Sequence, residues 1–443
     1  MTRRMFFTTA VAWAGAATGS QVQITINTRR KRGVIPRNFL GLGYEISSVS
    51  IPGLLSEKNT PYVDLVRKLG HGVVRVGGIT ADYASFAPQG QAVSTPKSSI
   101  VNLANLRELS SFLRATGWQL IWALNLGTRG VAEAVVEAEA VTANIGDKLL
   151  AFEIGNEPDL FNRGSSSHRP STYEYGDWLK EYRHYKKAIR EKLPNAVFAG
   201  PDAASATDWV TRLAADEGSD LKLLTHHYYR ECAGPNSTLD KLLRPDPKLA
   251  PLLNQLAAAT AQSGVPYRIC ETNSFCGGGK QGVSDTFGSA LWVLDFLWRL
   301  ADAGCAGVNV ETGLNQLDFV SWYSPIAENA AKPEYFGMLA FAQSVGGERV
   351  EVTTQAGDVN VSAYAVVHGQ ITSLTIVNKD VDRPVDVTVT MDRKFSQGKV
   401  MRLVAPSIES KQGVTLGDAD ERLAMKGNTA RVHLEQGSAV VIT

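Results

Sequence analysis

The chain of 443 residues lacks a surplus of charge of either sign. It has 45 Lys and Arg against 44 Asp and Glu, a formal net charge of +1, so no general attraction to nucleic acid or other polyanions is expected. It also has only four cysteines, too few for a disulfide scaffold in so long a chain, and their spacing matches no zinc signature. Beyond the first residues, no apolar run is long enough to span a bilayer. We therefore expect a globular protein with no metal, no cofactor and no nucleic-acid partner, and the oligomeric state is left open.

The cysteines divide into two pairs by their surroundings. Cys270 and Cys305 lie in apolar runs and are expected to be small buried hydrophobic residues. Cys232 and Cys276 lie in polar loops, where a bridge between them is an option that the sequence leaves open.

The N-terminus differs from the rest of the chain. It reads MTRRMFFTTAVAWAGAA, in which Arg3 and Arg4 precede an apolar stretch that ends in small residues. This order is typical of a cleaved secretory signal, here residues 1–20. The arginine pair also suits twin-arginine export. We expect a secreted or periplasmic protein with no membrane association once the signal is removed; the alternative is an ordinary N-terminus with chance arginines.

Short apolar runs alternate with amphipathic helical stretches between residues 36 and 345. The helical pattern is clearest in SDTFGSALWVLDFLWRLADAG, where apolar residues recur every three or four positions. Strands with apolar residues on both faces are typical of a parallel sheet. Eight such strands are predicted, at 39–45, 72–78, 118–125, 148–157, 196–202, 221–229, 266–271 and 306–311. Eight β-α units in this length predict an α/β fold, a (β/α)8 TIM barrel.

An open, doubly wound sheet is the competing interpretation. It is disfavoured because no G-x-G-x-x-G loop follows the first strand. Nearly every strand also ends in a polar residue, and a barrel would gather these ends at one face, where such enzymes carry their sites. The strand ends are Glu45, Asn125, Glu157, Asp202, His227 or Tyr229, Glu271 and Glu311.

After about residue 345 the pattern changes to alternating apolar and polar residues. Runs such as ITSLTIVNK and VDVTVTM are separated by Gly, Asp, Asn and Pro, which predicts an antiparallel β-sandwich. The segment VQITIN near the start has the same alternation. We therefore assign 22–35 together with 346–443 to an accessory sandwich domain that packs against the barrel.

Two strand-terminal glutamates are candidates for catalysis. Glu157 ends the fourth strand within GNEPDLF and Glu271 ends the seventh, so both would face the mouth of a barrel. Two carboxylates about 5–5.5 Å apart suit a retaining glycosidase, in which one attacks the anomeric carbon and the other acts as acid and then base. Asn156 is placed to hydrogen-bond the sugar 2-hydroxyl. The alternative, two surface or salt-bridged glutamates, explains less of the pattern.

GNEPDLF, THHYYR and ETNSFCGGGKQGVSDTFGSALWVLD closely resemble glycoside hydrolase family 79, which includes bacterial β-glucuronidases and the heparanases. The similarity runs from FLGLGYE through RVGGITADY to SWYSPI, with a matching C-terminal sandwich, and so covers most of the chain. The bacterial β-glucuronidases are the more similar branch.

The resemblance implies roles for particular positions. Glu157 matches the acid/base, Glu271 the nucleophile and Asn156 the asparagine beside the acid. Glu45 aligns with an acidic residue that contacts sugar hydroxyls at the non-reducing end. In THHYY, strand alternation turns either His226 and Tyr228 or His227 and Tyr229 inward; we favour His227 and Tyr229, with Tyr229 near the nucleophile.

The resemblance also assigns a function to the glycines after Glu271. In the related heparanases, backbone N–H groups at this position and a tyrosine from the eighth-strand loop hold the substrate carboxylate. Gly277, Gly278 and Gly279 would allow such an anion site, and Tyr323 in SWYSPI is the matching tyrosine. A flexible loop with no ligand is the alternative. Animal heparanases have a tyrosine where this chain has Cys276, which argues against identical contacts and against heparan sulfate.

The expected function is a retaining exo-β-glucuronidase that removes terminal β-linked glucuronic acid from glycans or conjugates. One alternative is a heparanase-like endo-acting enzyme, and another is a glycosidase of the same clan for a neutral sugar. An alternative of a different class is a non-catalytic carbohydrate-binding protein on the same barrel, which the presence of both glutamates disfavours. The aglycone and any 4-O-methyl preference are left open.

Overall fold

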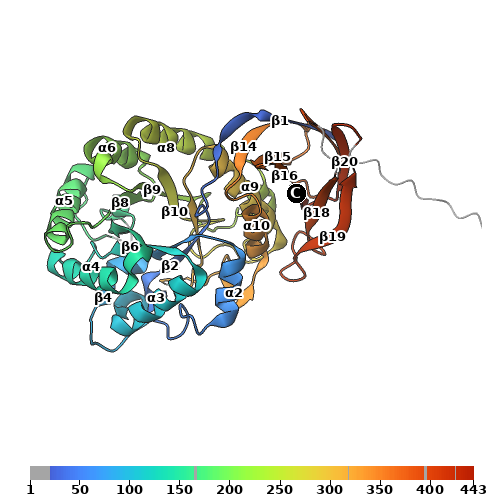
Figure 1. Cartoon of the computed structure of the whole chain (residues 1–443). Coiled ribbons are helices and arrows are strands. Elements are labelled where there is room, and N and C mark those ends of the chain that lie inside the picture. The colour runs from blue at the N-terminus through green and yellow to red at the C-terminus, as the bar shows by residue number, and fades with distance from the viewer. Residues whose placement is uncertain (1–19, 164–166, 318, 394–396, 425) are drawn as a thin grey trace, which may run out of the picture.

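The computed structural model describes residues 20–163, 167–317, 319–393, 397–424 and 426–443. The predicted export signal, residues 1–20, lies outside the described residues apart from Ser20. Figure 1 shows two bodies side by side, a ring of strands surrounded by helices and a separate curled sheet.

The ring is a parallel eight-stranded barrel with strand order β7-β6-β3-β2-β11-β10-β9-β8. A parallel bridge between Phe152 and Phe198 joins β7 to β8, so the sheet closes on itself. The strands are almost wholly buried because both their faces are covered, one by the barrel interior and one by helices. Their bounds are β2 Gly41–Glu45, β3 Val73–Gly77, β6 Gln119–Leu124, β7 Leu149–Ile154, β8 Ala199–Ala203, β9 Leu223–Tyr229, β10 Tyr267–Asn273 and β11 Val308–Glu311.

The longer helices form the outer layer of the barrel. The ends of α3 illustrate the local signals: the Asn102 side chain accepts from the Asn105 amide at the start, and Gly117 ends the helix with φ of 78°. The long helices are α2 Thr60–Lys68, α3 Leu103–Thr116, α4 Val131–Ile145, α5 Tyr175–Lys192, α6 Thr207–Glu217, α8 Leu249–Ser263, α9 Phe287–Asp302 and α10 Pro333–Ala342. Shorter elements are α1 Ile46–Val49, β4 Ser85–Phe86, β5 Ile100–Val101, α7 Leu239–Leu243, β12 Ile326–Ala327 and β13 Ala330–Ala331.

The second body is one continuous nine-stranded sheet with order β19-β18-β21-β16-β15-β14-β1-β17-β20. Its N-terminal strand β1 pairs antiparallel with β14 and parallel with β17, so the sheet is mixed at this one pair. It encloses a core of its own, built from inward residues such as Ile24, Ile376 and Val389. The strands are β1 Ser20–Val34, β14 Glu348–Gln355, β15 Val361–His368, β16 Ile371–Asn378, β17 Val385–Met391, β18 Gln397–Val404, β19 Thr415–Ala424, β20 Thr429–Leu434 and β21 Ser438–Ile442.

Helices α9 and α10 lie between the barrel and the sheet (Figure 1). Asp295 on α9 binds Lys379, which follows β16, at 2.6 Å. Trp298 of α9 stacks on Tyr364 of β15, with ring centroids 5.0 Å apart. The sheet is therefore joined to the barrel by buried polar and aromatic contacts.

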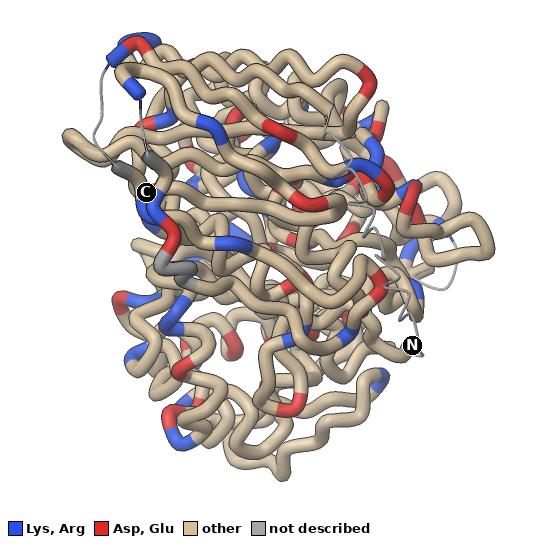
Figure 2. Tube along the Cα trace, turned by 90° about the vertical axis from the view of Figure 1, so that its right-hand side faces the viewer, with Lys and Arg blue, Asp and Glu red and all other residues tan. Residues whose placement is uncertain are grey.

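The charged residues carry no strong field of one sign. Figure 2 shows Lys and Arg interspersed with Asp and Glu over the face in view, in line with the formal net charge of +1. Among the described residues, no helix is long and apolar enough to cross a membrane.

Candidate active site

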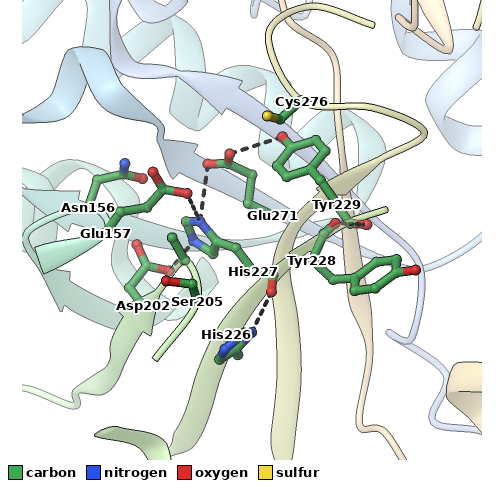
Figure 3. A network of polar contacts seen from close by, with 12 residues as sticks. Asn156, Glu157, Asp202, Ser205, His226, His227, Tyr228, Tyr229, Glu271 and Cys276 are labelled. Carbon is green, nitrogen blue, oxygen red and sulfur yellow. Dashed lines mark hydrogen bonds and ion pairs between the residues drawn. The ribbon is translucent and has the colours of Figure 1, made fainter. Parts of the chain in front are cut away.

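Four neighbouring barrel strands bring polar side chains together at their carboxyl ends. Glu157 follows β7, Asp202 lies on β8, His227 and Tyr229 on β9, and Glu271 on β10. Figure 3 shows these side chains pointing toward one another. This is the face at which (β/α)8 barrels carry their active sites.

The backbone around Glu157 is bent to present its side chain. Glu157 has φ of 50°, and Gly155 just before it has φ of 83°. The left-handed conformation is unusual for a residue other than glycine, but Pro158 follows and disfavours the right-handed helical region at Glu157. The Glu157 N–H donates to the Asp202 carbonyl at 3.0 Å. This bond to the neighbouring strand holds the turn in place. Backbone strain at functional sites is generally maintained by such surrounding contacts.

Two donors hold the Glu271 carboxylate. Arg75 Nη1 donates to Oε2 at 2.7 Å, and the Tyr229 hydroxyl donates to Oε1 at 3.0 Å. Both bonds fix the position of the carboxylate, as an attacking nucleophile requires.

His227 bridges the two sides of the site. Its Nδ1 lies 2.9 Å from Glu157 Oε1 and 3.8 Å from Glu271 Oε2, while its Nε2 lies 2.7 Å from Asp202 Oδ1. One carboxylate oxygen each from Glu157 and Glu271, with a ring nitrogen of His227, lie within 4.8 Å of one another. The two carboxyl groups are thus close neighbours, as a retaining glycosidase requires.

Burial and neighbouring charges set the protonation of this group. Burial raises the pKa of Glu157, His227 partly offsets this, and the Glu271 charge raises the pKa further. Burial lowers the pKa of His227, but Asp202 and Glu271 outweigh it and the net shift is upward. For Asp202, burial is outweighed by Arg75 and His227, and the pKa is about 2. Of Glu157 and Asp202, which both bind His227, Glu157 is therefore the carboxyl group suited to hold a proton.

Exposure separates the two glutamates from their supports. The side chains of Glu157 and Glu271 are 21% and 12% exposed, whereas Arg75, Asp202 and His227 are at most 1% exposed. A ligand at the barrel mouth can thus reach the two glutamates, and the other three act through them.

The orientation of Asn156 follows from its partner. Arg75 Nη2 donates to Asn156 Oδ1 at 2.8 Å, and because arginine only donates, the acceptor end of the amide must face it. The Asn156 NH₂ group is left to donate to a ligand. The Asn156 N–H donates to Asp82 at 3.2 Å, which fixes the backbone at this position.

Glu45 lies at the end of β2, near the site, and its hydrogen bonds go to Thr80 rather than to the glutamate pair. Its Oε2 accepts from both the N–H and the hydroxyl of Thr80, at 2.9 and 2.6 Å. Burial raises its pKa, and the charge of Glu311 raises it further. Glu311 accepts from the Gly313 N–H at 3.0 Å, and burial followed by the Glu271 charge raises its pKa to about 7. These two acids form a second, more deeply buried group beside Glu271.

The three glycines after Glu271 form a turn in which every φ is positive. Gly277, Gly278 and Gly279 have φ of 74°, 83° and 83°, conformations that favour glycine. Among the described residues, their N–H groups donate to no protein acceptor. Tyr323 is buried against this turn, since a Cβ at Gly279 would lie 3.0 Å from its ring. Its hydroxyl accepts from Gln316 Nε2 at 2.6 Å and also contacts the Tyr229 hydroxyl, which links it to the Glu271 side of the site.

The structure places His227 and Tyr229 in the site and directs the other two residues of THHYY elsewhere. His226 Nε2 lies 3.5 Å from Thr207 Oγ1, and the Tyr228 hydroxyl donates to Asp246 at 2.6 Å. Figure 3 shows the four side chains leaving β9 on alternate sides.

Two residues of the network were not identified as site residues from the sequence. Arg75 is wholly buried and binds Glu153, Glu271 and Asn156; the available signal was one arginine inside the apolar run VVRVGG. Asp202 was noted only as a polar strand end.

Two clusters of described residues bring possible metal ligands together: Glu157 with His227 and Glu271, and Glu153 with Asp202 and Cys270. Arg75 and His227 already supply positive charge to these carboxylates.

The bridge that the sequence left open is present. Cys232 and Cys276 form a disulfide between the loops that follow β9 and β10. Cys270 and Cys305 are free and buried, as their apolar surroundings predict.

Comparisons with known proteins find curated relatives of this chain. The chain is 25% identical to a β-glucuronidase of Aspergillus niger over 346 residues, covering 69% of this chain and 63% of the relative. It is 27% identical to a β-glucuronidase of Neurospora crassa, covering 75% and 68%, and 23% identical to the heparanase of Mus musculus, covering 75% and 72%. The matched region thus spans under two thirds of the Aspergillus protein. No family model matches the chain.

Solved structures share the fold. A 4-O-α-L-rhamnosyl-β-D-glucuronidase from Fusarium oxysporum superposes with a TM-score of 0.77 at 18% identity, covering 95% of this chain and all of the other. A family 51 arabinofuranosidase from Xanthomonas axonopodis superposes with a TM-score of 0.72 at 16% identity, covering 96% and 99%. The fold class, a TIM barrel with a C-terminal β-domain, is confirmed. The curated relatives are β-glucuronidases and a heparanase, all glycoside hydrolases, and this agrees with the resemblance to glycoside hydrolase family 79 that the motifs indicated.

Proposed function

We propose that the chain is a retaining exo-β-glucuronidase that hydrolyses terminal β-linked glucuronic acid from glycans or glucuronide conjugates. The observation that carries the proposal is the pairing of Glu157 and Glu271 within 4.8 Å at the barrel mouth, each with different hydrogen-bond partners. The curated relatives named β-glucuronidase support the choice of sugar.

In the first step, the Glu271 carboxylate attacks the anomeric carbon while the glycosidic C–O bond breaks. Glu157 gives its proton to the departing oxygen, and a glycosyl ester forms on Glu271. Arg75 and Tyr229 hold the attacking carboxylate in place. The NH₂ group of Asn156 donates to the sugar 2-hydroxyl, a bond that strengthens in the transition state.

In the second step, water hydrolyses the ester. The charge on Glu271 is absent while the ester exists, so one of the causes that raise the pKa of Glu157 is removed. Glu157 is then suited to accept a proton from water, which attacks the anomeric carbon and releases Glu271 as a carboxylate. The product keeps the β configuration.

The choice of an acidic sugar rests on the Gly277–Gly279 turn and Tyr323. Backbone N–H groups that donate to no acceptor among the described residues are suited to bind an anion, and Tyr323 is buried against the same turn. We assign the C6 carboxylate of glucuronic acid to this position. The near-zero net charge favours small conjugates and chain ends over long sulfated polymers, which favour basic grooves.

The test compares p-nitrophenyl β-glucuronide with p-nitrophenyl β-glucoside on the purified protein. We expect a strong preference for the glucuronide and, by proton NMR, the β anomer as the first product. Preference for the glucoside would contradict the assignment of the glycine turn and favour a neutral-sugar glycosidase. Release of oligosaccharides rather than monosaccharide from a glucuronic-acid polymer would contradict the exo mode.

A further inference from the structure

The disulfide lies where two loops of the site meet. Cys232 follows Tyr229 by a few residues and Cys276 directly precedes Gly277. Two backbone bonds reinforce the link, from Cys276 N–H to the Glu231 carbonyl at 2.9 Å and from Ala233 N–H to the Cys276 carbonyl at 3.1 Å. Figure 3 shows Cys276 beside the ring of Tyr229.

The glycine turn depends on its ends for its conformation. Three consecutive glycines have the greatest backbone freedom of any tripeptide, because glycine lacks a Cβ. Contacts with neighbouring residues must therefore hold their positive φ values. Beyond the turn, Lys280 N–H donates to Ser284 Oγ at 2.9 Å, and within it the Gly278 carbonyl accepts from Trp322 N–H at 2.6 Å. On the other side, the turn begins directly at the half-cystine Cys276.

We propose that the Cys232–Cys276 disulfide is a specificity-determining element, which holds the Gly277–Gly279 N–H groups in the geometry that binds the sugar carboxylate. The inference rests on the proposed function. Without the bridge, the turn would populate conformations in which the N–H groups diverge, and a glucuronide would have to reorder it on binding. Glu271 is held separately, by Arg75 and Tyr229, so the chemical step does not depend on the bridge.

The experiment measures kcat and KM of the Cys232→Ser/Cys276→Ser variant on p-nitrophenyl β-glucuronide and β-glucoside. If the competent population of the turn falls to about a tenth, KM for the glucuronide rises about tenfold with kcat nearly unchanged. The glucoside, which makes no use of the turn, should keep its kcat/KM within about twofold by the same relation. A bridge that only stabilises the fold would lower both substrates' rates together or neither. Cys305→Ser, at a buried thiol beside Tyr267 at the opposite end of β10 from the site, is the matched control and should leave the ratio unchanged.

A second measurement covers the case in which the double variant does not fold. The folded wild-type protein is treated with a small dithiol, which is oxidised to its own disulfide as Cys232 and Cys276 become thiols, and alkylation with mass analysis confirms the reduction. Reduction should lower the glucuronide-to-glucoside ratio about tenfold in the wild type, as in the variant. An unchanged ratio in the reduced or substituted protein would overturn the inference. Failure of the untreated wild type to hydrolyse the glucuronide would instead overturn the proposed function.

Discussion

Arg75 supplies the positive charge that pairs with several of the acids at the barrel mouth. It donates to Glu153, Asn156 and Glu271 from a position with no solvent exposure. Burying an unpaired arginine at that depth would cost much free energy. The acids around Arg75 therefore stabilise its charge, and Arg75 stabilises theirs. A lone charged residue in an apolar strand is the sequence signal of such a centre, but the sequence does not tell which acids it will meet.

At Glu157, substitution by glutamine should separate the acid from the base role. We expect Glu157→Gln to lower turnover of p-nitrophenyl β-glucuronide by about 10²–10⁴-fold, the usual contribution of general acid–base catalysis. Sodium azide should restore much of the rate and yield β-glucuronyl azide, because azide attacks the glycosyl ester without a general base.

Glu271→Gln is the matched comparison for that experiment. It should be inactive, and azide should give no β-azide, since no glycosyl ester can form without the carboxylate. Formation of β-azide by Glu271→Gln would show that Glu271 is not the nucleophile. Absence of β-azide with Glu157→Gln would show that Glu157 is not the acid/base.

The pKa of Glu157 should respond to the charge of Glu271. Burial raises this pKa first, and Glu271 adds to it against the opposing effect of His227. A raised pKa keeps the acid protonated to higher pH, so kcat/KM should decline only above the ordinary pKa of a glutamate. Replacing Glu271 by Gln removes one raising cause, and the pKa of Glu157 should fall, as measured by carbon-13 NMR titration of its carboxyl group. An unchanged or higher value in Glu271→Gln would contradict this electrostatic account.

At the scale of elements, strand β9 shows what alternation can and cannot predict. The period of two separates His227 and Tyr229 from His226 and Tyr228, but it does not say which pair faces the barrel interior. The sequence could not resolve this, because both pairs offer the same chemistry; partners from other strands, Glu157 and Glu271, decide it. Strand β19, Thr415–Ala424, was not predicted, since its glycine and acidic residues weaken the apolar alternation.

The two tyrosines of β9 give a matched pair of substitutions. Tyr229→Phe removes the bond to Glu271, and since hydrogen bonds to charged groups contribute about 1.5–3 kcal/mol, kcat/KM for the glucuronide should fall about 10–100-fold. Tyr228→Phe removes a comparable bond to Asp246 outside the site and should lower stability without changing kcat/KM. Equal kinetic effects of the two substitutions would contradict the division of this strand into an active and a structural face.

At the scale of the whole molecule, the periodicity of apolar residues was sufficient to predict the barrel. It was not sufficient to predict how the barrel contacts the C-terminal sheet. Eight apolar runs with helices between them leave few arrangements other than a closed parallel barrel. The contact with the C-terminal sheet depends instead on single residues, such as Lys379, whose sequence context NKD resembles an ordinary exposed turn. The structure buries this lysine, with its side chain 2% exposed, against Asp295 of α9.

Lys379→Met should therefore destabilise the whole molecule. Burial opposes ionisation of Asp295, but Lys379 and Arg299 outweigh it and lower the pKa of that carboxyl. Without the lysine, the partners of Asp295 that remain among the described residues are the partly exposed Arg299 and the Tyr364 hydroxyl. Because removing one partner of a buried pair leaves an uncompensated charge, the free energy of unfolding should fall by about 3 kcal/mol in urea denaturation.

Lys411→Met is the control for this prediction, since Lys411 also joins the C-terminal body to the barrel, through Asp285 at 2.6 Å, but its side chain is 50% exposed. Exposed ion pairs contribute about 0–1 kcal/mol, so this variant should unfold close to the wild type. Adding Asp295→Asn to Lys379→Met should recover part of the loss, because the buried charge is then absent. Similar losses from Lys379→Met and Lys411→Met, or a further loss in the double variant, would show that the buried pair does not join the barrel to the sheet in the way its burial implies.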